Sequence, residues 1–263
     1  MDARQLPARH GALWLLGGFA LFRRHPPMMT ALTFGYLLTV IVVNLIPKIG
    51  PFILPLLLPT LTVMLANGCR AVEQGKPFSS EIIGAGISAQ RVGLARLGGL
   101  HLLGSSLLVI GASVLGDPVN LNDGMSTEEL VALTTDMAIL LVLASPLLMA
   151  FWFAPLLTAW DGVGAAKSLF FSFVASWRNW KAFAAYGVVL VLVGAVVPGV
   201  ILIIAGQISQ SLLTVLNTAL RMILIFVLAP TMVASVYLSY RDVFAAPPEP
   251  EPEPELERSE TDA

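Results

Sequence analysis

The side chains that most often carry chemistry are scarce and scattered in this sequence. The sequence has three histidines, His10, His25 and His101, and no two of them are at a metal-binding spacing. The single cysteine, Cys69, can form no internal disulfide. No glycine-rich phosphate loop and no G-x-S-x-G nucleophile motif occurs. His101 lies in an apolar stretch, either as a packed or snorkelling side chain or as a proton carrier. The sequence therefore favours a protein that is not an enzyme and holds no cofactor or metal.

Three prolines, Pro51, Pro55 and Pro59, recur every four residues in one apolar stretch. Each lacks a backbone N–H donor and can leave the carbonyl one helical turn earlier unpaired, on one face of a helix. In lipid, such carbonyls need a partner from protein, water or a ligand. Two interpretations are open: a kinked helix that packs tightly against its neighbours, or a cavity lined by the freed carbonyls.

Two charges, Arg221 and Asp136, lie at similar depths in different apolar stretches. Arg221 precedes Arg241 by 20 residues, which is ~30 Å along a helix and places it at the outer boundary of a bilayer. Asp136 on another helix could pair with it. Arg221 is therefore either a snorkelling boundary anchor or a charge that faces a solute.

Aromatic and basic residues gather at two places that would lie at one membrane surface. They are Arg23, Arg24, Trp177, Arg178, Trp180 and Lys181. Such residues are ordinary interfacial anchors, but they also suit anionic lipid head groups. The sequence leaves both interpretations open.

The elements that would position these residues are membrane-spanning helices. The 263 residues are 56% apolar and 12% charged, against ~45–50% and ~25% in soluble domains. Charge-free stretches are long enough for helices that cross ~30 Å of hydrocarbon, and they do not alternate as barrel strands do. The sequence therefore predicts an all-α, polytopic membrane helix bundle. Its six predicted transmembrane helices span 27–47, 49–70, 97–116, 130–160, 182–206 and 210–240.

The basic residues predict the orientation of the bundle. Of the 15 lysines and arginines, all except Lys48 and Arg221 fall on one side of the predicted spans. The loop 117–129, on the other side, is acidic. Basic residues stay in the cytoplasm, so we expect a multi-pass protein of the bacterial inner membrane with both termini cytoplasmic.

The order of elements predicts three parallel repeats, each an interfacial helix followed by a transmembrane hairpin. The units cover about 11–70, 79–160 and 164–240. In the third interfacial helix, residues 164–181, serines recur every four residues, and we expect them to face water while the aromatic face rests on the acyl boundary.

The chain divides into a membrane domain, 1–244, and a tail, 245–263. The tail alternates proline with acidic residues, seven acids against one arginine, which predicts a disordered, solvated cytoplasmic segment. Such a tail either repels neighbouring molecules or docks onto a basic partner.

The stretches ARHGALWLLGGFALFRRHPP and WFAPLLTAWDGVGAAKSLFFSFVASWRNWKAFAAYG resemble an uncharacterised family of proteobacterial polytopic inner-membrane proteins. The resemblance covers nearly the whole chain except the tail. It implies an inner-membrane location and a helical fold, and it implies no activity. The short helix followed by a hairpin also loosely resembles the membrane domain attached to some glycerophosphodiester phosphodiesterases.

Two classes of function fit these patterns. The first is a non-enzymatic scaffold, assembly or lipid-organising component, and the alternative is a transporter of a lipid or a small apolar solute. The expected partners are membrane lipids and either another membrane protein or a second copy of the chain, with no nucleic acid. A polar cavity reaching mid-membrane would favour transport, and an apolar lateral cavity would favour lipid binding.

Overall fold

The computed structural model describes residues 3–115 and 127–244, and within them it contains helices and no strands. Most of the predicted loop 117–129 lies outside these residues. The whole of the predicted tail 245–263 also lies outside them. Two π-helical turns, Leu192–Val196 and Leu224–Leu228, each join two consecutive α-helices into one longer helical segment. The helices are α1 (Arg9–Arg24), α2 (Pro26–Asn44), α3 (Gly50–Glu73), α4 (Ser80–Ile83), α5 (Arg91–Leu115), α6 (Thr127–Asp161), α7 (Ala165–Arg178), α8 (Trp180–Val191), α9 (Val197–Ile208), α10 (Gln210–Ile223) and α11 (Ala229–Phe244).

Six helical segments of the described residues are long and apolar enough to cross a membrane. They form three hairpins: α2 with α3, α5 with α6, and α8–α9 with α10–α11. This confirms the predicted all-α bundle with six spans. The third span begins at Arg91 rather than at residue 97, because the helix continues past the apolar stretch into a basic, partly exposed turn.

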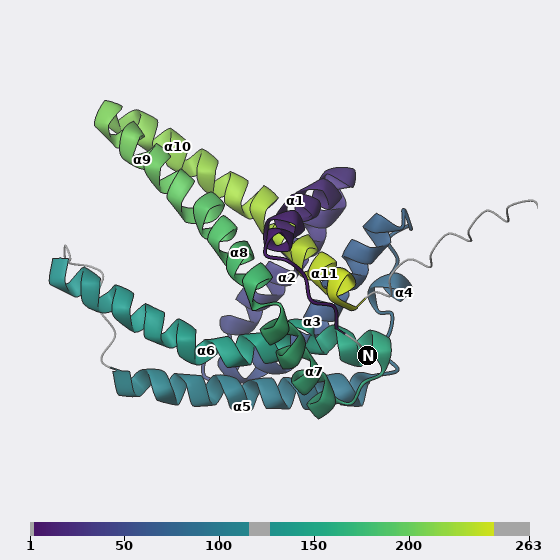
Figure 1. Ribbon diagram of the computed structural model, residues 1–263. Coiled ribbons are helices and arrows are strands. Elements are labelled where there is room, and N and C mark those ends of the chain that lie inside the picture. The colour runs from purple at the N-terminus through teal and green to yellow at the C-terminus, as the bar shows by residue number, and fades with distance from the viewer. Residues whose placement is uncertain (1–2, 116–126, 245–263) are drawn as a thin grey trace, which may run out of the picture.

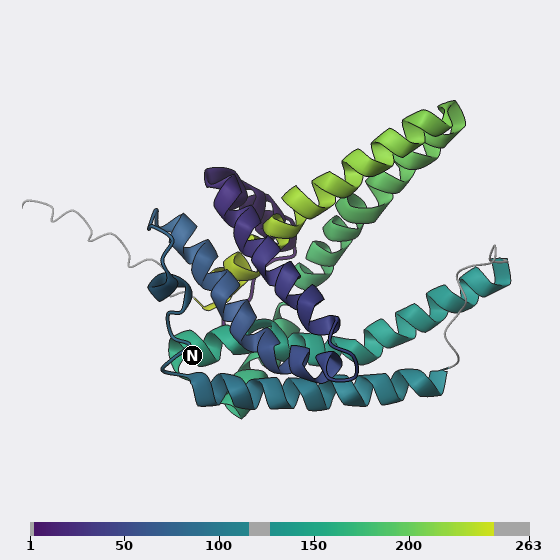
Figure 2. The ribbon, with the colours of Figure 1, turned by 180° about the vertical axis from the view of Figure 1, so that it is seen from behind.

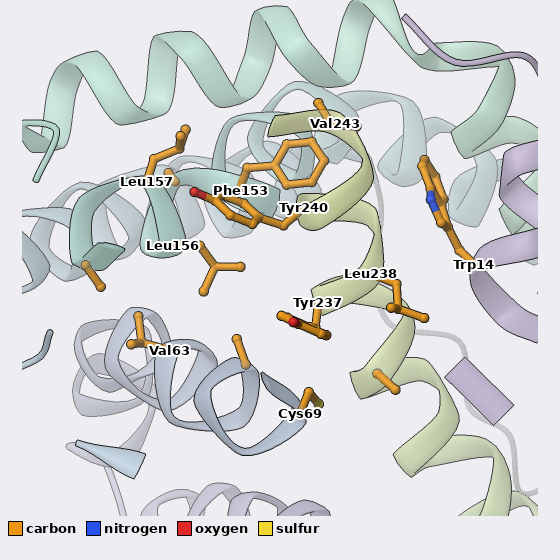
Figure 3. Packing of buried hydrophobic residues seen from close by; sticks show 14 of the residues in the cluster. Trp14, Val63, Cys69, Phe153, Leu156, Leu157, Tyr237, Leu238, Tyr240 and Val243 are labelled. Atoms are coloured by element: carbon orange, nitrogen blue, oxygen red, sulfur yellow. The ribbon is translucent and has the colours of Figure 1, made fainter. Parts of the chain in front are cut away.

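The three hairpins share a packed core at one end of the bundle, and α3 also packs along α5 as far as Pro55 and Leu56. We call the end with this core the basic end, because the lysines and arginines that are predicted to be cytoplasmic lie there. Both described chain ends meet at it, since the Arg4 amide donates to the Val243 carbonyl over 2.9 Å. The core is concentrated at this end, with Phe153 and Tyr240 side by side and Trp14 across α11 from them (Figure 3).

Away from the basic end the hairpins diverge. The α5–α6 hairpin and the α8–α11 hairpin extend in different directions in both views (Figures 1 and 2). Their side chains there are apolar and uncovered: Leu107, Val142 and Ile203 are 70%, 70% and 66% exposed. In a bilayer these faces contact lipid or another membrane protein, because water would not cover so much apolar surface.

The short helices link each hairpin to a different one. Helix α1 packs against α8 and α11, α7 packs against α6, and the single turn of α4 packs against α3. Each short helix therefore lies against the hairpin of another predicted unit. Because α4 has only four residues, the second unit lacks a full interfacial helix, and the three-fold repeat stays a prediction.

Glycines on α1 permit its close approach to the third hairpin. A Cβ atom at Gly11 would lie 2.2 Å from the Ala182 carbonyl oxygen, and one at Gly18 would lie 2.5 Å from the Thr231 carbonyl oxygen. Both neighbours are backbone atoms, which cannot move aside as a side chain can. The N-terminal helix is thus a packed part of the bundle.

The serine face of α7 is buried, so the prediction that it faces water was wrong. Ser168, Ser172 and Ser176 are at most 1% exposed. The Ser172 hydroxyl accepts from the Phe153 amide over 2.9 Å and donates to the Met149 carbonyl over 2.8 Å. It therefore bonds to two backbone groups one turn apart in α6. The serines pack inward because they supply hydrogen bonds to a neighbouring helix.

Candidate functional site

Acidic residues at the basic end hold α11 against its neighbours. Glu73, in the last turn of α3, accepts a hydrogen bond from the Tyr237 hydroxyl at one carboxylate oxygen and pairs with Arg241 at the other. Asp161, at the end of α6, accepts from the Tyr240 hydroxyl. The two tyrosines, three residues apart on α11, thus connect it to the first and second hairpins.

A third acid connects α11 to the N-terminal helix. Asp242 accepts from the Trp14 indole N–H over 3.1 Å and pairs with Arg241 over 2.9 Å. Arg4 also donates to the Asp242 carbonyl over 2.9 Å. The N-terminal segment and α1 are therefore tied to the last turn of the chain.

Two buried asparagines satisfy backbone groups at the same end. Asn67 donates to the carbonyls of Ile83 and Ala85 and accepts from the Trp160 indole N–H. Asn179, between α7 and α8, donates to the Arg4 carbonyl and accepts from the Leu6 amide. Each amide group holds an irregular segment of the chain in place, which is the usual role of a buried polar side chain that is fully paired.

No sequence motif marks these acids, tyrosines and asparagines as a site. A signal was present, because Tyr237, Tyr240 and Arg241 lie on one side of the last turns of α11, and Glu73 and Asp161 each end a span. Most of the basic residues lie at this end of the bundle. Acidic side chains that end a span there need hydrogen-bonding or ion-pair partners. The partners could not be chosen without knowing which helices are neighbours.

The proline helix α3 packs against α5 at its two inner prolines. Pro51 is in the first turn, where the missing N–H breaks no helical bond, and it is exposed. Pro55 and Pro59 are buried. The Pro55 carbonyl, left without its usual donor by Pro59, lies 3.3 Å from Nδ1 of His101 on α5. This contact fits the packed-helix interpretation, and the two cavities described below do not include these prolines.

We expect the contact between His101 and the Pro55 carbonyl to stabilise the protein only because Pro59 has no backbone N–H to bond to that carbonyl. His101→Leu should destabilise the protein by about 1–2 kcal/mol, the cost of leaving a buried carbonyl unsatisfied. In a Pro59→Ala background the restored amide can bond to the Pro55 carbonyl, so the same substitution should cost much less. Thermal unfolding of the four proteins gives the coupling energy. Equal costs in both backgrounds would contradict this assignment.

Arg221 and Asp136 lie on different hairpins that diverge at this depth. Arg221 is on α10 and Asp136 on α6, these helices are not among the closely packed pairs of the described residues, and no ion pair joins the two side chains there. Arg221 is exposed and Asp136 is half-buried. The candidate pair is thus not brought together, because the packed core that would align the hairpins lies at the other end.

The aromatic and basic rim residues fall into two groups. Trp177, 62% exposed, and Trp180, 54% exposed, flank the α7–α8 junction with Arg178, and the Lys181 ammonium lies 5.9 Å from the Trp180 ring. Arg23 and Arg24 end α1, ~18 Å along that helix from its contact with α8 at Gly11. Arg23 lies over Phe19, and Arg24 donates to the Glu73 carbonyl over 3.4 Å.

Two cavities adjoin each other on the side formed by α2 and α3. One, of about 940 Å³, lies between the α1–α2 turn and the segment after α3, where Arg24, His25 and Lys76 line it. The other, of about 360 Å³, runs between α2 and α3 and is lined by apolar residues with Gly35 and Tyr36. Phe78 lines both cavities. Lys76 and Phe78 were not singled out from the sequence, because their neighbours come from the preceding hairpin.

The described residues contain no group of three His, Cys, Asp or Glu side chains that could share a metal ion. Cys69 is buried, and so is shielded from reagents in water. Glu73, Asp161, Asp242, Asn67 and Asn179 at the basic end are all hydrogen-bonded to side chains or backbone groups of neighbouring segments. The arrangement can therefore bind the helices together and offer two basic patches to the membrane surface.

Comparison with known proteins agrees with this description. A protein of Burkholderia thailandensis whose name is "Probable inner membrane protein" is 37% identical over 203 residues, which cover 71% of this chain and 74% of that protein. No family model and no solved structure matches the chain. The identity and coverage confirm the resemblance to an inner-membrane family. The chain, with its six apolar helices, belongs to the same family of polytopic inner membrane proteins as this Burkholderia relative.

Proposed function

We propose that the protein is a non-enzymatic, lipid-organising component of the inner membrane. The observation that carries the proposal is the contrast between the two ends of the bundle. Hydrogen-bonded acids, tyrosines and asparagines hold the basic end together, whereas apolar faces such as those at Leu107, Val142 and Ile203 stay uncovered at the other. Lipid molecules fill the space between the diverging hairpins, so the protein sets their local arrangement.

The alternative is a transporter of a lipid or a small apolar solute. The groove between α2 and α3 favours it, because it is apolar and large enough for part of a lipid. Transport also needs a path to the other leaflet. The cavities described here reach from the basic end along α2 only to Thr39, which favours binding over passage.

The two functions differ in what purified protein does to lipid. Native mass spectrometry of the detergent-extracted protein should reveal retained phospholipid, together with the number of protein copies. In liposomes containing the protein, a fluorescent phospholipid should exchange between leaflets no faster than in empty liposomes. Protein that retains no phospholipid, or that accelerates the exchange, would overturn the lipid-organising function.

The proposal places the basic end in the cytoplasm. Alkaline phosphatase is active only outside the cytoplasm, so fusions after Asn122 should be active and fusions after Gly75 should be inactive. Protein levels measured by immunoblot control for expression. The reverse pattern of activity would invert the topology.

A further inference from the structure

The mouth of the larger cavity carries two basic side chains without acidic partners. Arg24 makes one hydrogen bond, its long contact with the Glu73 carbonyl, and most of its guanidinium donors stay free. Lys76 lines the same cavity and follows the end of α3, where Gly75 has φ +63° and the Lys76 amide donates to the Ala71 carbonyl over 2.9 Å. No carboxylate among the described residues pairs with either side chain.

The acid that lines this cavity, Glu73, bonds through its carboxylate to groups other than these two basic side chains. Both carboxylate oxygens of Glu73 are engaged, by Tyr237 and by Arg241. Helix α2 begins here, at Pro26, whereas α1 and α3 end here, so the positive charge of the mouth comes from the Arg24 and Lys76 side chains and not from helix dipoles. The cavity mouth therefore attracts an anion, and the planar Arg24 guanidinium suits a phosphate.

The adjoining groove accepts a hydrocarbon chain. The Thr39 hydroxyl donates to the Gly35 carbonyl over 2.7 Å, so it is not left unpaired in the groove. A Cβ at Gly35 would have no neighbour within 4 Å, which makes this part of the groove open. From Pro27 to Thr39 the two cavities follow α2 for ~18 Å, more than half of the ~30 Å hydrocarbon thickness of a bilayer.

We propose that these adjoining cavities bind one anionic phospholipid, with its phosphate between Arg24 and Lys76 and an acyl chain along the α2–α3 groove. Phe78, 42% exposed, lies where the two parts meet. A soluble anion would use the mouth alone and leave the apolar groove empty. A lipid uses both, and it can enter sideways from the membrane. This site rests on the proposed lipid-organising function and gives it a lipid class.

The head-group half is tested with the full chain in nanodiscs of equal parts phosphatidylglycerol and phosphatidylcholine. After mild extraction, native mass spectrometry gives the ratio of the two lipids retained. Arg24→Gln with Lys76→Gln should lower the preference for phosphatidylglycerol about tenfold. Arg178→Gln with Lys181→Gln removes the same charge from the other rim group, and it measures the general attraction of an anionic surface for basic residues. We expect this control to change the ratio much less.

The acyl half is tested by filling the groove. Gly35→Leu should reduce the retention of both lipids, because the new side chain occupies the open part of the groove. Gly187→Leu is the matched control, since a Cβ there also has no neighbour within 4 Å but it lies on α8. Thermal unfolding of each variant confirms that it is folded before its lipids are counted.

The outcomes separate this site from the function on which it rests. If the native protein retains no phospholipid, the proposed function fails. If it retains phospholipid but both charge variants change the ratio equally, or Gly35→Leu acts like its control, this site is wrong. Inorganic phosphate in excess should not displace phosphatidylglycerol; displacement would mean that the mouth is a site for a free anion, and it would overturn the lipid assignment.

Discussion

Trp14→Ala should be among the most destabilising single substitutions in the chain. Trp14 is 1% exposed, packs 5.3 Å from the Phe183 ring and donates its indole N–H to Asp242. Removing a buried tryptophan costs about 3–5 kcal/mol, and here it also leaves α1 without its contact to the last turn of α11. Thermal unfolding in detergent should show a fall in Tm of roughly 10 °C or more, or the protein should fail to accumulate in the membrane.

Trp177→Ala is the matched control for Trp14→Ala. Trp177 was predicted as an interfacial anchor, and it is 62% exposed. Its loss should change Tm by no more than a few degrees. Trp14→Phe keeps most of the buried ring and loses the hydrogen bond to Asp242, so it should fall between the two. Equal effects of the two alanine substitutions would contradict the packed position of α1.

Gly98→Leu should have an effect of similar size at the contact between the first and second hairpins. A Cβ at Gly98 would lie 2.5 Å from the Leu56 carbonyl oxygen and 2.8 Å from the Leu56 Cα. Because these are backbone atoms of α3, α5 must move away from it, which breaks the contact of His101 with the Pro55 carbonyl as well. We expect a loss of about 3 kcal/mol or more, measured as Tm.

Gly99→Leu is the adjacent control on the same helix. A Cβ at Gly99 would have no neighbour within 4 Å, and leucine has a higher helix propensity than glycine by about 0.5–1 kcal/mol. This variant should be as stable as the native protein or slightly more stable. A Gly98→Leu protein with native Tm would show that α3 and α5 are not in close contact.

The number and placement of the spans could be predicted because they depend on local composition. Each span contains an apolar stretch of charge-free residues, and charges at its ends, such as Arg24, Arg70 and Asp161, mark where the helix leaves the hydrocarbon. The ends of helices were predicted less well. Helices such as α5 and α3 continue beyond the apolar stretch, because packing at the basic end stabilises extra turns that hydropathy does not predict.

The contacts between helices could not be predicted because they depend on which helices are neighbours. Regular serine spacing predicted the polar face of α7 correctly, but Ser172 faces α6 instead of water. Arg221 and Asp136 have matching depth and opposite charge, yet they lie on separate hairpins. Arg24 was predicted as a rim residue, whereas its hydrogen bond to the Glu73 carbonyl and the cavity that it lines together with Lys76 depend on the α2–α3 hairpin folding back on itself.

Cysteine cross-linking in native membranes tests most directly whether the hairpins are joined at one end and separated by lipid at the other. The Phe34 and Phe226 rings stack with their centroids 4.8 Å apart. The double variant Phe34→Cys with Phe226→Cys is made in a Cys69→Ala background. A short bifunctional reagent should join its two cysteines. The pair made by Asp136→Cys and Arg221→Cys lies on diverging hairpins (Figure 2) and should not be joined. Efficient cross-linking between positions 136 and 221 within one chain would show that the hairpins close at this depth, and it would contradict the account.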